Sequence, residues 1–298
     1  MRFGLVLGGG GVVGIAWEVG VLAGLARAGV LDPAAAAVIV GTSAGSVVGT
    51  RLALGASVES LVEEQSRPAE VAPSPANGDG SRPRGDLTAV MEIFGELRKA
   101  PEVTPEVARV VGQKAMAAPT PPEDRWVESF EATIGKGTSW PTGRDLRVAA
   151  LDCHTGERRM WTSADEGLVD VARAVASSCA VPGMFPTVGI GESRYTDGGV
   201  WSGTNADVLL DDGLDAVLVV APTAAAPLQP GRRSALDVEV EQLEDAGVSV
   251  HKIAPGPTFA TEVGLLNLMN PAMRGRGLEI GIDDGAAAAV AVKELLGG

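Results

Sequence analysis

The order of strands and helices near the amino terminus constrains the fold most. Residues 2–7 form a short apolar run that ends in four consecutive glycines, which predicts a buried strand and a tight turn. Apolar side chains then recur at helical spacing over 15–28, and Gly29 is placed to end that helix. A second buried strand is predicted over 38–40, followed by another glycine turn and a helix over 44–54. This order predicts parallel strands joined by right-handed crossovers, which is an α/β fold.

The remainder of the chain continues this pattern after an interruption. Residues 67–124 differ from the rest because proline and glycine are dense at 73–83 and again at 119–122. Between these stretches lie two short amphipathic segments, 87–97 and 106–116. We interpret 67–124 as a helical insertion, either an excursion over the surface or a lid. Further strands are predicted over 146–151, 158–161, 216–221 and 248–253, with a hairpin turn at Thr155-Gly156, and further helices over 169–177 and 283–296. The whole chain, 1–298, is predicted to be a single domain.

Composition argues against several classes of function. The 298 residues include 24 basic and 38 acidic side chains, which gives a formal net charge of −14. This charge disfavours nucleic-acid binding, which needs a basic face, and it disfavours polybasic attachment to anionic lipid. Two cysteines and two histidines provide no disulfide scaffold and no metal site, and no cofactor is indicated. No sequence feature indicates an oligomeric state.

The apolar amino-terminal stretch is predicted to be folded protein. Glycines and Glu18 interrupt it, and no cleavage site follows, so it does not fit a signal peptide. No run of 18 uninterrupted apolar residues occurs elsewhere, so no membrane span is predicted. A cytoplasmic location is therefore the default expectation.

Ser43 lies at the centre of a motif that fits a catalytic nucleophile. The sequence Gly41-Thr42-Ser43-Ala44-Gly45 is a G-x-S-x-G between a predicted strand and a predicted helix. Its glycines permit the sharp turn that exposes the hydroxyl group, and the helix N-terminus favours the negative charge that develops there. The alternative is that Ser43 simply caps the helix in a tight turn.

The glycine-rich stretch 8–11 is the second motif. It follows the carboxyl end of the first strand, one crossover away from the Ser43 turn, so the two loops are predicted to be neighbours. The amides of Gly10 and Gly11 would then form an oxyanion hole beside Ser43. The stretch Gly9–Gly14 also matches a dinucleotide-binding fingerprint, but no acidic residue ends the second strand. A nucleotide-binding protein is the alternative function of this loop.

Asp197 is the best candidate for the base that a serine nucleophile needs. It is followed by two glycines, which let its loop approach another backbone closely, and a carboxylate can act as a general base. A simple Asp-Gly turn is the alternative. His154 lies beside a hairpin turn, and His251 lies within an apolar strand pattern. A triad of Ser43, Asp197 and His251 has the chain order of an α/β-hydrolase, but that fold places more strands before its nucleophile.

Taken together, these motifs resemble the patatin-like phospholipase family. The resemblance rests on the glycine loop, the G-x-S-x-G and the Asp-Gly-Gly in this order, and it covers residues 3–55 and 146–210. The segment 176–186 and Asn205 also fit the pattern of the family. The resemblance implies a three-layer α/β domain with a mainly parallel central sheet, which varies in the region of 67–124.

The resemblance also implies a function. It is that of a lipid acyl hydrolase that cleaves carboxylic esters of phospholipids or other lipids without a cofactor. Ser43 would be the nucleophile, Asp197 the base, and the amides of Gly9, Gly10 and Gly11 the oxyanion donors. The partner would be a lipid or acyl-ester substrate, with no stable membrane insertion, although transient membrane contact stays open.

Val13 departs from the pattern of the family. The family's loop usually carries arginine at this position, before the last glycine of the loop. Because the oxyanion donors are backbone groups, the hole can survive this change. The missing charge is expected to weaken the positioning of the loop or the binding of an anionic headgroup. A catalytically silent relative that binds acyl chains or a partner is a further alternative.

Overall fold

A computed structural model describes residues 1–67, 87–224 and 233–297. The chain divides into two compact units. The first comprises Met1–Glu70, Pro141–Arg147 and Gly203–Gly298, and the second comprises Val71–Trp140 and Val148–Ser202. The fold is α/β with a mainly parallel central sheet flanked by helices, which confirms the predicted class.

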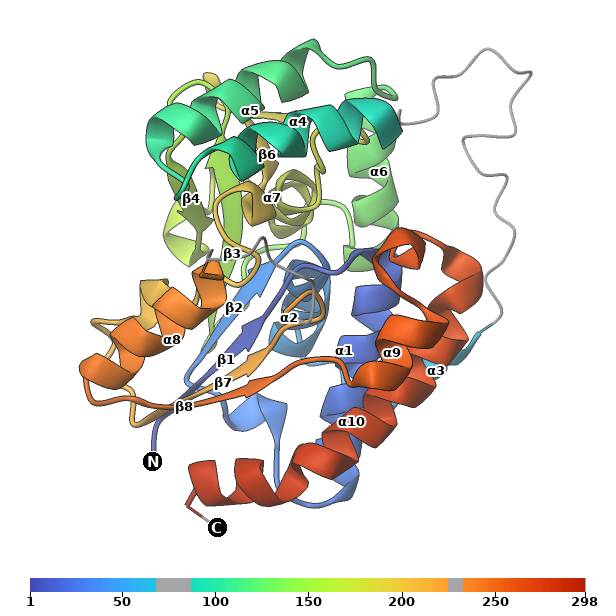
Figure 1. Cartoon of the computed structure of the whole chain (residues 1–298), viewed down its shortest axis with the longest axis vertical. Helices are drawn as coiled ribbons and strands as arrows, with labels where there is room; N and C mark the ends of the chain where they lie inside the picture. The colour runs from blue at the N-terminus through green and yellow to red at the C-terminus, as the bar shows by residue number, and fades with distance from the viewer. Residues whose placement is uncertain (68–86, 225–232, 298) are drawn as a thin grey trace. The chain divides into compact units, whose positions relative to one another are not determined.

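The first unit contains four parallel strands in the order β2-β1-β7-β8 (Figure 1). The strands are β1 (Phe3–Leu7), β2 (Val38–Thr42), β7 (Ala216–Val220) and β8 (Ser249–Ile253). Every residue of β1, β2 and β7 is buried, as expected where both faces of a parallel sheet are covered. Leu7 pairs with Gly41 on one side and with Val220 on the other. The loops after β1 and β2 therefore start side by side.

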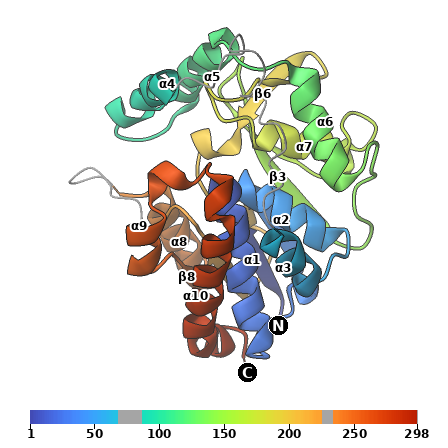
Figure 2. The ribbon, with the colours of Figure 1, turned by 90° about the vertical axis from the view of Figure 1, so that its right-hand side faces the viewer.

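Helices cover both faces of this sheet. Figure 1 shows α1 and α10 side by side on one side of the sheet and α8 on the other, and Figure 2 shows α3 beside α1 and α10. The helices of the first unit are α1 (Gly11–Arg27), α2 (Ala44–Ala53), α3 (Val58–Ser66), α8 (Ala235–Asp245), α9 (Pro257–Glu262) and α10 (Arg274–Leu295). Short 3-10 turns join them: η1 (Pro33–Ala35), η5 (Ala206–Leu209), η6 (Leu265–Asn267) and η7 (Pro271–Met273).

Glycines bring α1 and α10 into backbone contact. A Cβ atom at Gly20 would overlap the carbonyl oxygen of Leu278, and one at Gly281 would overlap the carbonyl oxygen of Trp17. Trp17 also donates a hydrogen bond from Nε1 to Oδ2 of Asp284, at 2.8 Å. The two helices can approach this closely only because these positions carry no side chain.

Substitution of Gly281 by alanine is expected to lower the unfolding free energy by about 3 kcal/mol, because the new methyl group meets the α1 backbone, which cannot yield cheaply. Gly275→Ala is the matched control, since it lies on the same helix and a Cβ there would meet no atom within 4 Å. Alanine also has the better helix propensity, so this control is expected to be neutral or stabilising. Guanidinium unfolding of the two variants tests the difference, and equal stabilities would contradict this account of the packing.

The second unit is built on antiparallel strands. Strand β3 (Asp145–Asp152) continues into this unit from Arg147 and pairs with β4 (Arg158–Trp161) and β6 (Ser193–Asp197). Strand β5 (Val188–Ile190) pairs with β6. The predicted hairpin is confirmed, with Gly156 at φ 78° in its turn. The helices of this unit are α4 (Leu87–Lys99), α5 (Pro105–Ala117), α6 (Glu123–Ile134) and α7 (Val171–Ser178).

The predicted insertion is partly a core element. Its two predicted helices are confirmed as α4 and α5, but α5 does not form a surface excursion. Ala108 and Val111 of α5 share a buried apolar cluster with Leu151 of β3. A Cβ atom at Gly112 would lie 2.6 Å from Cα of Cys153, so α5 packs directly on the backbone after β3. The proline- and glycine-dense stretch 73–83 lies outside the described residues.

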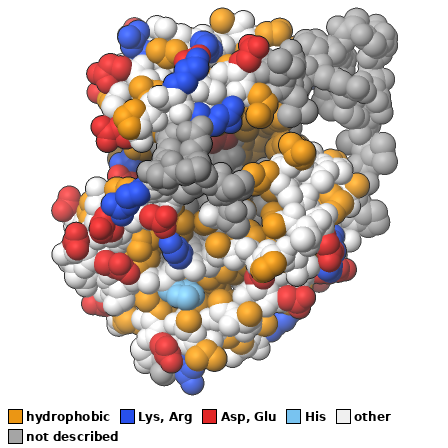
Figure 3. Space-filling view, in the orientation of Figure 1, with side chains coloured by type: hydrophobic (Ala, Val, Ile, Leu, Met, Phe, Trp, Pro, Cys, Tyr) orange, Lys and Arg blue, Asp and Glu red, His pale blue; other side chains and the backbone are white. Residues whose placement is uncertain are grey.

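Charged side chains of both signs lie among apolar ones over the described residues of the face that Figure 3 shows.

Candidate active site

Ser43 adopts a strained backbone conformation at the sharp turn between β2 and α2. Its φ and ψ angles are 52° and −115°, in a region that residues other than glycine rarely occupy. It takes the N-cap position of α2, yet its side chain makes no capping hydrogen bond. Ser43 therefore occupies the N-cap position without capping the helix through its side chain.

The flanking glycines make this turn possible. A Cβ atom at Gly41 would lie 2.5 Å from Cα of Ser46, and one at Gly45 would overlap the carbonyl oxygen of Leu7. The carbonyl oxygen of Ser43 accepts hydrogen bonds from the N–H group and the Oγ hydroxyl of Ser46, at 2.9 and 2.7 Å. The predicted steric need for both glycines is confirmed.

The glycine loop lies against the Ser43 turn, as predicted. The N–H group of Gly45 donates to the carbonyl oxygen of Gly8 at 3.0 Å. A Cβ atom at Gly9 would lie 3.6 Å from Cβ of Ser43. Both loops follow the carboxyl ends of adjacent parallel strands, where the sites of open α/β sheets form.

The amides of this loop have different partners. The Gly9 N–H group donates to the carbonyl oxygen of Gly203 at 2.8 Å, and the Gly8 N–H group donates to that of Val220 at 2.9 Å. Gly9 is thus not placed to act as the oxyanion donor that the family resemblance implies. In the described part of the chain, the N–H groups of Gly10 and Gly11 have no hydrogen-bond partner.

Residues 203–206 support both loops of the first unit, and only Asn205 was singled out from the sequence. Asn205 adopts a left-handed conformation and donates from Nδ2 to Oγ1 of Thr42 at 3.0 Å, directly beside Ser43. Oε2 of Glu239 accepts hydrogen bonds from Oγ1 of Thr204 at 2.5 Å and from the N–H group of Ala206 at 3.0 Å. The acidic pattern of α8 predicts a solvated helix face, but Glu239 is buried.

Asp197 belongs to the second unit, where it ends β6. Its side chain accepts a hydrogen bond from the N–H group of Gly199 at 2.7 Å, and its own N–H group donates to Ala180 at 3.1 Å. A Cβ atom at Gly198 would lie 2.5 Å from the carbonyl oxygen of Ala149 in β3. The predicted close approach of the Asp-Gly-Gly loop to another backbone is confirmed.

The segment 176–186 lies against the same strand of the second unit. The carbonyl oxygen of Ala180 also accepts from Oγ1 of Thr196, at 2.6 Å. Phe185 stacks on Trp126 with ring centroids 3.9 Å apart, and Trp126 donates from Nε1 to the carbonyl oxygen of Ala176. The segment therefore fixes the strand end that carries Asp197.

The structure explains the absence of arginine at position 13. Val13 is fully buried between α1 and α10, and a Cβ atom at Gly277 would lie 2.7 Å from its Cγ1 atom. An arginine in this contact would bury a charge at high cost. The valine is thus a packing residue of this chain, and position 13 places no cation beside the loop.

His251 does not complete a triad with Ser43. His251 lies in the edge strand β8 and pairs with Leu218 of β7. Leu218 pairs with Leu5 of β1, and Leu5 pairs with Ile39 of β2, so His251 lies level with Ile39 across the sheet. Three strand spacings of about 4.8 Å separate β8 from β2, a distance of about 14 Å. Burial lowers the pKa of His251. The α/β-hydrolase alternative is therefore wrong.

The glycine loop is not open in the way a dinucleotide site requires. A Cβ atom at Gly10 would lie 2.6 Å from Cβ of Pro222, and one at Gly11 would lie 2.6 Å from Sδ of Met269. The N–H group of Val13, in the first turn of α1, donates to the carbonyl oxygen of Leu268 at 3.0 Å. A phosphate group at this helix end would compete with that bond. This packing disfavours nucleotide binding.

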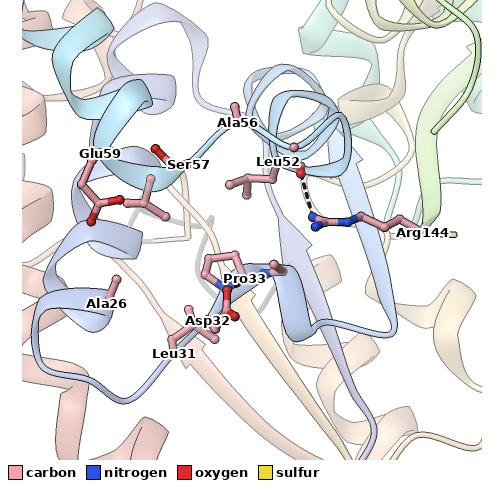
Figure 4. A pocket seen from close by; sticks show the side chains of 12 residues that line it. Ala26, Leu31, Asp32, Pro33, Leu52, Ala56, Ser57, Glu59 and Arg144 are labelled. Atoms are coloured by element: carbon pink, nitrogen blue, oxygen red, sulfur yellow. Dashed lines mark hydrogen bonds between the residues drawn. The ribbon is translucent and has the colours of Figure 1, made fainter. Parts of the chain in front are cut away.

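A pocket of about 430 Å³ in the first unit lies away from these residues (Figure 4). Its lining includes Asp32 and Pro33 before β2, Leu52 at the end of α2, and Arg144, which donates to the carbonyl oxygen of Leu52 at 2.8 Å. Ser43 lies at the opposite end of α2, about 15 Å away along the helix. The pocket contains none of the predicted site residues.

The described residues show neither a metal site nor a membrane-spanning helix. They contain no group of three or more histidine, cysteine, aspartate or glutamate side chains that could hold a metal ion. None of their helices is both long enough and apolar enough to cross a bilayer.

A strained serine lies between a parallel strand and a helix, beside a glycine loop, which is an arrangement typical of α/β acyl hydrolases. The sequence model of the family described as patatin-like phospholipase matches residues 5–210. This match covers more than half of the chain, and the chain belongs to this family of lipid acyl hydrolases.

The chain is also similar to two solved structures. One is VipD from Legionella pneumophila, with 15% identity and a TM-score of 0.47 over 97% of this chain and 67% of that one. The other is the type III effector protein ExoU, with 15% identity and a TM-score of 0.37 over 96% of this chain and 53% of that one. No curated protein matches the sequence.

Proposed function

We propose that this protein hydrolyses carboxylic ester bonds of lipids with Ser43 as the nucleophile. The observation that carries the proposal is the strained backbone of Ser43, whose side chain does not cap α2. Strain of this kind is retained where the surrounding structure over-determines it, commonly at catalytic residues. The N-terminus of α2 favours negative charge at the serine oxygen as it attacks the ester carbonyl.

Asp197 is proposed as the general base of a dyad. It would accept the proton of Ser43 as the serine oxygen bonds to the carbonyl carbon, and then return it to the departing alcohol. Water, activated in the same way, would then hydrolyse the acyl-enzyme and release the fatty acid. The order of the motifs supports this role. The chain after Asp197 also returns to the first unit at Gly203, which hydrogen-bonds to Gly9.

The amides of Gly10 and Gly11 are proposed to stabilise the oxyanion, because the Gly9 N–H group is already bonded to Gly203. Gly9 instead allows the loop to approach Ser43, since a Cβ atom there would lie in contact with Ser43. In this proposal both units, 1–298 with the insertion 67–124, work as one patatin-like domain.

Fluorophosphonate labelling, read by intact mass and peptide mapping, tests the dyad. We expect a single adduct on Ser43, no adduct in Ser43→Ala, and labelling slowed at least about a hundredfold in Asp197→Asn. Asp211→Asn, a change at an exposed aspartate, is expected to label at the rate of the wild type. An adduct on another serine, or undiminished labelling of a folded Asp197→Asn, would refute the assignment.

A further inference from the structure

Two leucines of the first unit are exposed on a short turn. Leu265 is 46% exposed and Leu266 is 91% exposed, both in η6 between α9 and α10. Single exposed apolar residues are common on protein surfaces. This pair differs from such residues because it lies beside the candidate active site.

The residues that follow the pair cover the glycine loop. Leu268 accepts the hydrogen bond from the Val13 N–H group, and the space that a Cβ at Gly11 would fill is occupied by Met269. Figures 1 and 2 both show the segment between α9 and α10 over the amino end of α1. The exposed leucines are therefore anchored to the loop that is proposed to hold the oxyanion.

Hydrogen bonds fix the turn that carries these leucines. Asn267 donates from Nδ2 to the carbonyl oxygen of Val263 at 2.8 Å, and the N–H group of Asn270 donates to the carbonyl oxygen of Asn267 at 2.8 Å. Asn270 in turn caps η7 by accepting from the N–H group of Ala272. Because the turn is held at both ends, the leucines are presented to solvent on a defined support.

The size of this apolar surface and the charge of the chain favour a lipid surface over a protein as its partner. Two leucines supply a small part of the roughly 800 Å² per partner that a specific protein interface buries, whereas a lipid surface accepts single apolar side chains. The net charge of −14 opposes an anionic surface. Among the described residues, the two arginines that follow this turn are already occupied. Arg276 pairs with Glu262 and Glu279, and Arg274 bonds to Gln65 and to the Glu64 carbonyl oxygen.

We propose that Leu265 and Leu266 insert into the surface of a zwitterionic lipid aggregate and bring the glycine loop to that surface. The biological purpose of this contact rests on the proposed function, since a lipid ester must reach Ser43 from the aggregate. The contact itself requires only the two leucines and the anchored turn.

Co-sedimentation with phosphatidylcholine vesicles tests the contact. The double variant Leu265→Ser, Leu266→Ser is expected to bind the vesicles at least about tenfold more weakly than wild type. Val290→Ser is the matched control, since Val290 is 71% exposed on α10, and its binding is expected to equal that of wild type. The double variant should keep wild-type fluorophosphonate labelling and wild-type hydrolysis of a short soluble ester. Its hydrolysis of vesicle phosphatidylcholine should fall by at least about tenfold, in step with its weaker binding.

Each opposing result is distinct. Absent wild-type binding, unchanged binding of the double variant, or binding that requires phosphatidylserine would overturn the proposal. If analytical ultracentrifugation shows wild-type dimers that become monomers in the double variant, the leucines form a contact between two copies of the chain. This result would also overturn the proposal. Ser43→Ala should still bind vesicles. Leucine-dependent binding without any labelling of Ser43 would refute the proposed hydrolysis alone.

Discussion

Hydrolysis of a short activated ester by the Ser43→Ala variant is expected to fall by a factor on the order of 10⁵ to 10⁶ in kcat, the scale on which serine hydrolases lose activity with their nucleophile. The substitution removes the oxygen atom that is proposed to form the acyl-enzyme. The turn itself is expected to keep its conformation, because the tight packing at Gly41 and Gly45 is unchanged. The residual rate would come from the oxyanion donors and from substrate binding alone.

The matched control is Ser60→Ala, at an exposed serine of α3 in the same unit whose hydroxyl donates only to the Ser57 carbonyl oxygen. Its kcat is expected to stay within twofold of wild type. Initial rates with a soluble ester, together with circular dichroism of each variant, make the measurement. A loss of less than tenfold in a folded Ser43→Ala variant would exclude Ser43 as the nucleophile.

The part of the site that could be predicted from the sequence is the part that depends on local backbone chemistry. The turn around Ser43 needs glycine on both sides, and the Asp197 loop needs glycine after the aspartate, so the motifs carry their own geometry. One rule predicts that the Ser43 turn and the loop 8–11 lie side by side. Parallel strands one crossover apart place the loops that follow them at the same edge of the sheet.

Tertiary contacts determined what the sequence pattern missed. Helix α10 was predicted from 283 and begins at Arg274, because Gly275, Gly277 and Gly281 weaken its helical pattern. Two of these glycines allow the packing on α1 that stabilises the helix. No local signal distinguishes Glu239 from the other acidic residues of α8, because its burial depends on Thr204 and Ala206, which are distant in the sequence.

The same distinction applies to the loop donors. Gly9, Gly10 and Gly11 are equivalent in sequence, but only Gly9 donates to Gly203, a partner that no local pattern identifies. Val13 departs from the sequence pattern of the family. The physical reason for a valine at this position is its packing against Gly277 of α10, which the sequence alone does not show.

Glu18 gives the second large effect, a stability that depends on pH. It lies on α1 with its side chain fully buried, and neither carboxyl oxygen makes a hydrogen bond within the described residues. Burial raises the pKa of Glu18 well above its usual range. The nearby amide of Gly8 lowers this pKa by less than burial raises it, and since that N–H group donates to Val220, burial is the dominant cause. We therefore expect the Glu18 side chain of α1 to stay protonated in the folded protein at pH values where the unfolded chain is ionised.

The sign of the effect follows from proton binding. Below the unfolded pKa of about 4.3, both states are protonated and Glu18 contributes no pH dependence. Above it, the unfolded chain releases this proton while the folded chain retains it, so the unfolding free energy falls by about 1.4 kcal/mol per pH unit up to the folded pKa. Glutamine at position 18 has no such proton. The stability of Glu18→Gln relative to wild type is thus expected to rise with pH across this window.

Urea unfolding of wild type and Glu18→Gln at pH 5, 6 and 7 measures this difference directly. Glu59→Gln serves as the control, because Glu59 lies exposed on α3 and its variant should show a nearly constant difference from wild type. A difference between Glu18→Gln and wild type that stays constant over these pH values would mean that the buried carboxyl group is ionised in the folded protein. A compensating cation or ordered solvent would then have to lie beside it, because an isolated carboxylate is too costly to bury in an apolar helix interface.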